Sequence, residues 1–190
     1  HAVSIGAHGC LMLPPFYLKG LSDDAILDCY RWVIDRVLAQ RPASHAPLRI
    51  YAYHIPQISA VPLSHHVIAT LLREYPQVLA GIKDSQCERA HSVALAAAFM
   101  NDVPVYVGNE ADLRTLGRLG SRGAISGLAN FWPQRVHQLV MQPDARGTAE
   151  AEAGFIAQLA GGQALIGPSP KKAALYQQAA ACRVLHFSCH

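Results

Sequence analysis

Short apolar runs alternate with longer amphipathic segments along most of the chain. The apolar runs lie at residues 9–13, 48–53, 78–82, 103–107 and 124–128. The longer segments lie at residues 23–40, 64–74, 88–100, 111–119 and 133–141. Short runs that are apolar throughout predict parallel strands buried on both faces, and a spacing of roughly 20 to 40 residues is that of βα units. We therefore expect an α/β protein with five such units.

Helix signals are clearest in residues 23–40. The apolar positions of this segment follow the 3.6-residue period of a helix at Ile26, Leu27, Tyr30, Val33, Ile34 and Val37. Ser22 can cap the helix, and the two aspartates after it stand where the helix dipole favours negative charge. Ser64 can cap the next helix in the same way, so both helix starts are predicted.

The pattern alone leaves an open doubly wound sheet and a barrel as alternative architectures. A dinucleotide-binding sheet carries a glycine-rich loop after its first strand. No such loop follows residues 9–13, and Gly117, Gly120 and Gly123 precede a run instead of following one. We expect these three glycines to form turns.

Composition narrows the class of protein. Of the 190 residues, 51% are hydrophobic and 15% charged, which predicts a compact globular protein. The net charge is only +3 and the densest basic spot is Lys171-Lys172, so we expect no nucleic-acid partner. No apolar run approaches the ~18 residues of a membrane span, and we expect neither a membrane segment nor a signal peptide. Five cysteines without a paired pattern favour free thiols in a reducing cytoplasm.

Lys83 stands at the carboxyl end of the run at residues 78–82. A charged amine in a buried strand is costly, and an amine removed from water is more easily deprotonated and attacks carbonyl carbon. Strand ends of this kind are where α/β enzymes place their active sites. The alternative is a lysine that has left the strand and reaches water.

Tyr53 ends the preceding run, thirty residues before Lys83. If the two strands are neighbours, their ends lie about 5 Å apart, and the phenol and the amine could meet over one pocket. The phenol could then donate and recover a proton as a carbinolamine and an imine form and break. The alternative is a tyrosine that closes the core with its hydroxyl in water.

The two candidate residues stand in short motifs, Tyr-His-Ile-Pro at residues 53–56 and Gly-Ile-Lys-Asp-Ser at residues 81–85. These resemble the Tyr-Asn-x-Pro motif and the lysine segment of the dihydrodipicolinate synthase / N-acetylneuraminate lyase family. Further matches in the right order are residues 15–17, 108–110, 123–126 with Asn130, and 168–170 with Lys172. The resemblance runs from about residue 5 to residue 176.

The resemblance implies a (β/α)8 TIM barrel, in which the five runs are strands four to eight. Such a barrel needs ~250 residues, so we expect an N-terminally incomplete chain without the first three strands and without the family's Thr-Thr segment for the pyruvate carboxylate. Residues 1–5 would be the end of a helix before Gly6. We expect a partial barrel at residues 1–145 and a C-terminal helical extension at residues 146–190.

The resemblance also implies roles for individual residues. Lys83 would form an imine with pyruvate or a 2-keto (sugar) acid, and Tyr53 would be the proton donor and acceptor. Tyr17 would be the relay tyrosine that a neighbouring subunit contributes in a dimer or tetramer. Ile125 would offer a backbone contact to the keto acid, and Gly108 would keep the pocket floor open. The chemistry needs a lysine imine and no cofactor.

Three positions depart from the family pattern, and a fourth indicates the substrate class. His54 replaces the usual asparagine, and Phe16 replaces the first tyrosine of a pair. Ile58 stands where dihydrodipicolinate synthases place an arginine for a substrate carboxylate, which argues against that activity. Ser59 resembles the sugar-acid lyases, so we include it in the substrate site and expect a hydroxylated 2-keto acid.

Other functions remain as alternatives. The C-terminal Cys/His residues are too close together for the usual zinc spacing, and we expect no metal: Cys182, His186, Cys189 and His190. We expect Cys87 to be a buried or half-buried free thiol. An inactive fragment or relative that keeps only the barrel scaffold is the main alternative to a lyase. A phosphate-binding barrel is weaker, because no glycine-rich loop follows the fifth run.

Overall fold

A five-stranded parallel sheet forms the centre of the protein. The computed structural model describes residues 2–130 and 132–145. The strands are β1 (Cys10–Met12), β2 (Ile50–His54), β3 (Leu79–Asp84), β4 (Val105–Val107) and β5 (Gly123–Ala124). Each strand pairs in parallel with the next one along the chain, in the order β1-β2-β3-β4-β5. A doubly wound sheet reverses its strand order, so the consecutive order favours a barrel wall.

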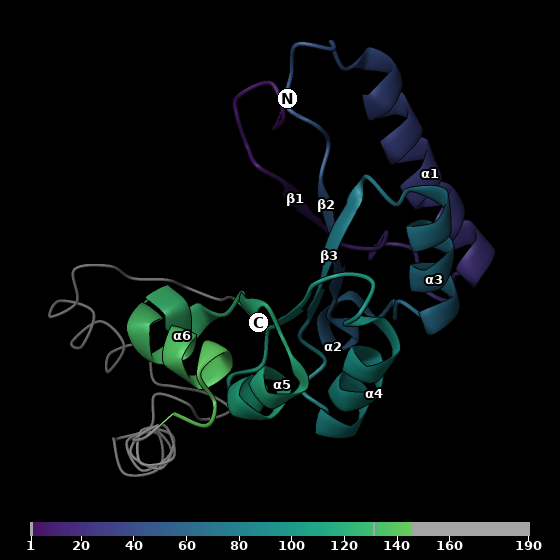
Figure 1. Ribbon diagram of the computed structural model, residues 1–190. Coiled ribbons are helices and arrows are strands. Elements are labelled where there is room, and N and C mark those ends of the chain that lie inside the picture. The colour runs from purple at the N-terminus through teal and green to yellow at the C-terminus, as the bar shows by residue number, and fades with distance from the viewer. Residues whose placement is uncertain (1, 131, 146–190) are drawn as a thin grey trace, which may run out of the picture.

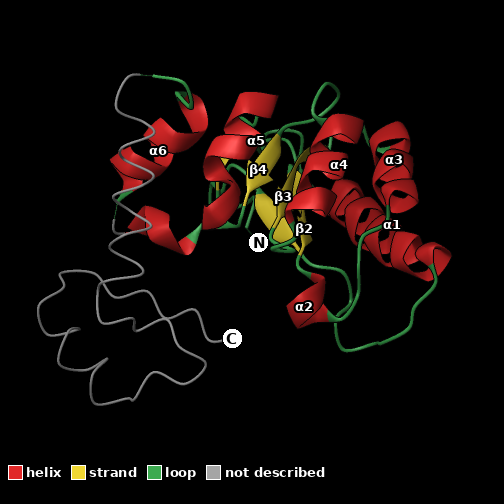
Figure 2. Cartoon of the chain, turned by 90° about the horizontal axis from the view of Figure 1, so that it is seen from below, coloured by secondary structure: helices red, strands yellow, loops and turns green. Residues whose placement is uncertain are grey.

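Helices line one side of this sheet. They are α1 (Asp23–Gln40), α3 (His65–Glu74), α4 (Arg89–Phe99), α5 (Leu113–Leu119) and α6 (Pro133–Met141). Three short helical segments follow strand ends: α2 (Pro56–Ser59), η1 (Glu110–Asp112) and η2 (Gly127–Asn130). The longer helices lie side by side along the strands (Figures 1 and 2). A single helix layer outside a consecutive parallel sheet is the arrangement of a (β/α)8 barrel.

The predicted helix starts of α1 and α3 are confirmed. Ser22 Oγ accepts a hydrogen bond from the Ala25 N–H at 3.3 Å, and Ser64 Oγ accepts one from the Val67 N–H at 3.1 Å. Ser64 also donates to Asp23 at 2.6 Å, so the two caps tie the helix starts together. Local signals therefore determine where both helices begin.

A larger and a smaller apolar core lie between the sheet and the helices. The larger one joins β1 to β4 with α1, α3 and α4, and includes Ile26, Tyr30, Ile34, Ala52, Ile68, Ile82 and Leu95. Tyr30 is fully buried, donates its hydroxyl to the Met12 carbonyl at 2.9 Å, and has a pKa raised by burial. The smaller core joins α5 and α6 to Val107 of β4.

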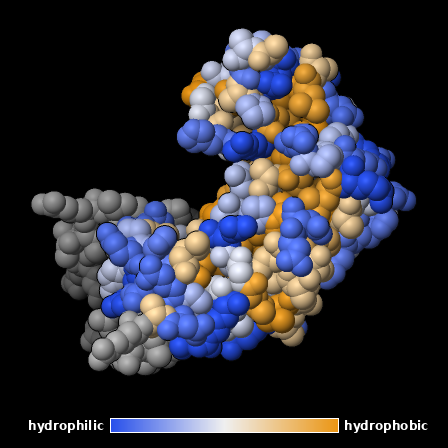
Figure 3. Space-filling view, viewed as in Figure 1, coloured by the Kyte–Doolittle hydropathy of each residue, from blue (hydrophilic) through white to orange (hydrophobic). Residues whose placement is uncertain are grey.

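Residues on the other face of the sheet are less buried. Tyr51, Tyr53, Lys83 and Tyr106 alternate with the buried strand residues and are all half-buried. The Tyr51 and Tyr106 rings meet edge to face, 5.7 Å between centroids, over Gly81, where a Cβ would come within 2.5 Å of the Tyr51 ring. In Figure 3 the molecule is hollowed on this side, between its N-terminal part and α6.

Some expected boundaries differ from the structure. The third strand continues through Lys83 to Asp84, two residues beyond the expected end. The fifth expected run, residues 124–128, is strand only at Gly123–Ala124. The Ile125 N–H still bonds to the Val107 carbonyl, and the chain then turns into η2, where the Leu128 N–H bonds to the Glu110 carboxylate.

Gly117 does not lie in a turn as expected, whereas Gly120 and residues 2–7 have the expected local structure. Gly117 lies inside α5 and is not a turn residue, because a Cβ there would meet the Val140 backbone of α6 at 2.3 Å. Gly120 ends α5 with a φ of 106°, as a turn glycine. The Ala7 and Gly6 N–H groups bond to the Ala2 and Val3 carbonyls, which is a helix-ending motif at the expected place.

Expectations for the C-terminal part of the chain and for membrane segments stand as follows. Helices expected in the C-terminal extension, residues 146–190, and the Cys/His cluster lie outside the described residues. Among the residues that are described, no helix combines the length and the apolarity needed to cross a membrane.

Candidate active site

Tyr53 and Lys83 meet at the carboxyl ends of β2 and β3. The two residues are Cα partners in the parallel register. Lys83 Nζ lies over the Tyr53 ring, 4.0 Å from its centroid. Because Lys83 is half-buried within β3, its amine has not left the strand for open water. The structure therefore brings the expected amine and phenol together at a strand end, where barrel enzymes hold their reactive groups.

A cavity of about 690 Å³ opens in front of this pair. It is lined by Tyr53, Ile55, Gln57, Ile58, Lys83, Ser85, Cys87, Gly108, Glu110, Ile125, Ser126 and Gly127. Four of the six predicted site residues line it, from four different strand ends: Tyr53, Lys83, Gly108 and Ile125. The volume is in the range of small-molecule sites.

The other two predicted site residues do not line this cavity. Tyr17 is 85% exposed and packs on Phe16, with 4.5 Å between ring centroids. Ser59 is buried, and its hydroxyl donates to the Val61 carbonyl at 3.0 Å and accepts from the Val61 N–H at 3.2 Å. Within the described chain, Ser59 therefore shapes the turn after α2.

Three polar residues that were not predicted as site residues also line the cavity. The hydroxyls of Ser85 and Ser126 are buried and have no hydrogen-bond partner among the described residues. A buried polar group without a partner costs free energy, so both hydroxyls are suited to bind a ligand. Glu110 adds a carboxylate. Ser85 and Glu110 follow strand ends that were predicted, and that position is the signal that could have identified them. Ser126 lies within the expected fifth run, which ends earlier in the structure.

Gly108 allows two strand ends to approach each other closely. Its N–H donates to the Asp84 carbonyl at 2.7 Å. A Cβ at this position would lie 1.9 Å from Ser85 Oγ and 2.7 Å from the Asp84 carbonyl oxygen. Glycine is therefore required here by space.

Cys87 is exposed, and the expectation of a buried or half-buried thiol is wrong. It lies at the cavity mouth, where the chain turns with a φ of 64° between β3 and α4. Partial desolvation and then the charges of Glu110, Asp112 and Asp84 raise the pKa of its thiol. The neutral thiol is a poor nucleophile, so the raised pKa argues against Cys87 as the nucleophile of this cavity.

Known proteins resemble this chain over most of its length. An N-acetylneuraminate lyase from Danio rerio is 30% identical over 142 residues, which are 74% of this chain and 43% of the relative. A dihydrodipicolinate synthase structure from Agrobacterium tumefaciens superposes with a TM-score of 0.69 and 30% identity, over 84% of this chain and 52% of that one. YagE from E. coli K12, of the dihydrodipicolinic acid synthase family and in complex with pyruvate, gives a TM-score of 0.70 at 23% identity, with the same coverage.

These similarities confirm the fold class as a partial (β/α)8 barrel. The chain spans between 40% and 48% of the length of the curated relatives that it matches. The relatives with a named activity are lyases and synthases. The model of the family described as "Dihydrodipicolinate synthetase family" matches residues 1–159. The chain therefore belongs to the dihydrodipicolinate synthetase family.

Proposed function

We propose that this protein is a class I lyase or aldolase in which Lys83 forms an imine with pyruvate or a hydroxylated 2-keto acid. The observation that carries the proposal is the position of Lys83 Nζ over the Tyr53 ring, in a cavity at the carboxyl ends of β2 and β3. A lysine amine in such a place is a nucleophile for carbonyl carbon. Membership of a family that contains lyases supports the same chemistry.

The proposed reaction begins when the neutral amine of Lys83 attacks the keto carbon. Tyr53 donates a proton to the oxygen of the carbinolamine, which leaves as water as the imine forms. The C3–C4 bond of the protonated imine then breaks: its electron pair forms the C2=C3 bond of an enamine, and the C4 hydroxyl gives its proton to the Tyr53 phenolate as C4 leaves as an aldehyde. Tyr53 passes this proton to C3, which gives the protonated imine of pyruvate. In the reverse direction the enamine attacks a carbonyl carbon and forms the bond. Tyr53 regains its proton when the imine is hydrolysed.

The lining of the cavity supports a hydroxylated substrate over that of a dihydrodipicolinate synthase. Ser85 and Ser126 present hydroxyls without partners among the described residues, and Glu110 can accept hydrogen bonds from substrate hydroxyls. Ile58 lines the cavity where that synthase would place an arginine. An apolar side chain cannot bind a second carboxylate.

The proposal extends to the oligomeric state, the cellular compartment and the domains of this protein. Tyr17 would complete the site of a neighbouring subunit in a dimer or tetramer, and its 85% exposure leaves it accessible for this contact. The cysteines in the described residues are free thiols, which favours a cytoplasmic protein. A C-terminal helical extension at residues 146–190 would follow the partial barrel.

A protein that keeps the scaffold without the chemistry is the second candidate. The two candidates make opposite predictions for the covalent step.

Borohydride trapping with pyruvate tests the covalent step. Reduction of the imine leaves an adduct that intact mass and peptide mapping locate. The experiment uses this chain and the chain joined to the part of a curated relative that it does not match. We expect the adduct on Lys83, none on Lys83→Arg, and a normal level on Lys19→Arg, because the Lys19 amine bonds to backbone carbonyls outside the cavity.

Each outcome assigns a function. An adduct on Lys83 in either protein supports the lyase, and an adduct on the joined protein alone means that the chemistry needs that further part. No adduct on either protein rejects the lyase and leaves the scaffold.

A further inference from the structure

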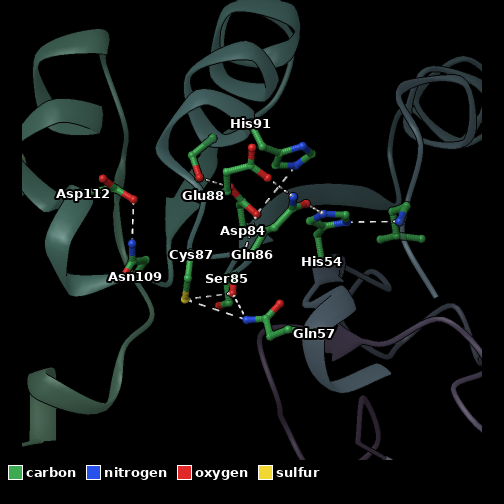
Figure 4. A network of polar contacts seen from close by, with 12 residues as sticks. His54, Gln57, Asp84, Ser85, Gln86, Cys87, Glu88, His91, Asn109 and Asp112 are labelled. Carbon is green, nitrogen blue, oxygen red and sulfur yellow. Dashed lines mark hydrogen bonds and ion pairs between the residues drawn. The ribbon is translucent and has the colours of Figure 1, made fainter. Parts of the chain in front are cut away.

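A buried polar cluster lies directly behind Tyr53 and Lys83. The next residue of each strand, His54 of β2 and Asp84 of β3, points to the helix layer, because strand side chains alternate between faces. These two residues are Cα partners and are 1% and 2% exposed. His91 of α4 stacks on His54, with ring centroids 4.6 Å apart and planes at 16°. Figure 4 shows the cluster from close by.

The three side chains resemble a metal site in their spacing alone. One ligand atom from each lies within 4.8 Å of the others. However, His54 Nδ1 accepts a hydrogen bond from the Leu63 N–H at 3.1 Å, so its ring proton is on Nε2, which donates to Gln86 Oε1 at 2.6 Å. A metal on Nε2 would move that proton to Nδ1, against the Leu63 N–H. The donor set therefore fits a neutral, hydrogen-bonded histidine and not a metal ligand.

His54 connects the segments that follow the two reactive residues. Leu63 lies between α2 and α3, whereas Gln86 lies just after β3. The Gln86 N–H donates to Asp84 Oδ1 at 3.2 Å, and its side-chain amide donates to Glu88 at 2.9 Å. The end of β2 is thereby tied to the segment after β3 by a side-chain bond, in addition to the sheet ladder.

Asp84 receives a separate fixed set of partners. Ser92 of α4 donates to Asp84 Oδ2 at 2.5 Å. His91 Nε2 lies 4.0 Å from Asp84 Oδ1 and has no hydrogen-bond partner among the described residues. The buried carboxylate is thus anchored to α4, and β3 is held just beyond Lys83.

We propose that His54, as its neutral Nε2–H tautomer, is a positioning residue that acts through Tyr53 and keeps its phenol beside the Lys83 amine. This inference rests on the proposed function. Tyr53 and His54 share one peptide bond at a strand end, so a shift of His54 shifts Tyr53. Displacement of a reacting group by about 1 Å can cost on the order of 10²-fold in rate.

The position of His54 also makes its hydrogen bonds sensitive to acid. A proton on Nδ1 would turn the acceptor of the Leu63 N–H into a donor and break that bond. The groups that face the ring are Asp84 of β3, His91 of α4 and His65 of α3, and Glu88 contacts its partner Gln86. Burial lowers the pKa of His54, so the neutral tautomer is the form present near neutral pH.

Three substitutions separate positioning from folding. His54→Asn puts Oδ1 where Nδ1 accepts the Leu63 N–H, but cannot titrate. His54→Phe keeps the ring and loses both hydrogen bonds. His66→Gln, on an exposed position of α3, is the matched control. For each protein, the initial rate of pyruvate adduct formation under borohydride is measured from pH 5 to 8, together with unfolding in urea.

We expect folded His54→Phe to form the adduct about 10-fold more slowly than the wild type. We expect His54→Asn to react at most of the wild-type rate above pH 7. The ratio of wild-type to His54→Asn rates cancels every effect of pH that the two proteins share. We expect this ratio to be constant above pH 7 and to fall as pH decreases below 6.5 towards the lowered pKa of His54. Urea unfolding at each pH shows whether both proteins stay folded, which separates a change in rate from a change in the folded fraction.

Several results would overturn the inference. A His54→Phe protein that reacts at the wild-type rate rejects it, and so does a ratio that is flat from pH 5 to 8. If His54→Phe does not fold, the ratio for His54→Asn decides alone. Stoichiometric Zn²⁺ binding that His91→Ala abolishes would reject the assigned tautomer. The absence of an adduct on both the wild-type chain and the joined protein rejects the proposed function, whereas an adduct without dependence on His54 rejects only this inference.

Discussion

The two faces of the β2 and β3 ends differ sharply in how their polar groups are satisfied. On the inner face, the Tyr53 hydroxyl and the Lys83 amine have no hydrogen-bond partner within the described residues, and both border a cavity. On the outer face, one residue further along, His54 and Asp84 are buried and hydrogen-bonded. A strand, with its period of two, can therefore place reactive groups and the groups that hold them on adjacent residues.

Removal of the phenol oxygen is expected to have the largest effect. Tyr53→Phe keeps the ring beneath Lys83 and loses the proton donor, so adduct formation should slow by about 10²-fold or more. Its urea unfolding should match the wild type, because no described residue bonds to the hydroxyl. Tyr51→Phe, on the same strand and face, is the control and should react normally. Equal rates for the two variants would contradict a role for the Tyr53 proton.

A methyl group at Gly108 should disturb both faces. The Cβ of Gly108→Ala would lie 1.9 Å from Ser85 Oγ on the cavity side and 2.7 Å from the Asp84 carbonyl. Overpacking of this kind costs about 1–3 kcal/mol of unfolding free energy, and the adduct rate should fall as well. Gly20→Ala, in an exposed turn with a φ of 68° and no atoms near its Cβ position, introduces backbone strain without a steric clash, and its adduct rate should stay normal. Normal stability and rate for Gly108→Ala would contradict the close approach.

Loss of the Ser92 hydroxyl should weaken the outer face alone. Ser92→Ala removes the donor at 2.5 Å from a buried carboxylate, and hydrogen bonds to charged groups contribute about 1.5–3 kcal/mol. We expect a loss of that size in urea unfolding. Ser44→Ala, in an exposed loop, should leave the midpoint unchanged. An unchanged midpoint for Ser92→Ala would mean that water replaces the donor without cost.

The smallest expected effect is a dependence of stability on pH. Because burial lowers the pKa of His54 below its ordinary 6.5, the unfolded chain binds a proton at a higher pH than the folded protein does. This contribution leaves the unfolding free energy unaffected above pH 7 and lowers it as pH falls through 6.5 towards the folded pKa. Urea unfolding of wild type and His54→Asn at pH 7.5 and 5.5 measures this contribution. If the difference in unfolding free energy between the two proteins is the same at both pH values, burial does not keep His54 neutral.

Much of the fold follows from local signals in the sequence. The bounds of α1 were predicted to the residue, because the cap Ser22, the acidic first turn and the apolar period all lie within the segment itself. Lys83 and Tyr53 were predicted as strand-end residues from the length of two apolar runs. These signals involve neighbours a few positions apart, which the chain contacts whatever the rest of the fold does.

Other features were predicted wrongly or not at all, and each depends on distant residues. Gly117 was expected in a turn and lies in α5, because only the approach of α6 requires a glycine there. The fifth run was expected to be a longer strand, but the Glu110 carboxylate bonds to Leu128 and turns the chain into η2. Neither contact can be predicted from the residues next to it in the sequence.

The sequence by itself determined the βα alternation, the position of the lysine and tyrosine, and the family resemblance, because these reside in periodicity and in short motifs. Tertiary structure alone decided which groups face the cavity and which support them. Ser85, Ser126 and Glu110 converge because parallel strands end at one edge of the sheet. His54 meets His91 because α4 packs over β2 and β3. Such contacts join residues tens of positions apart, and packing of the sheet against its helices is the physical reason that they form.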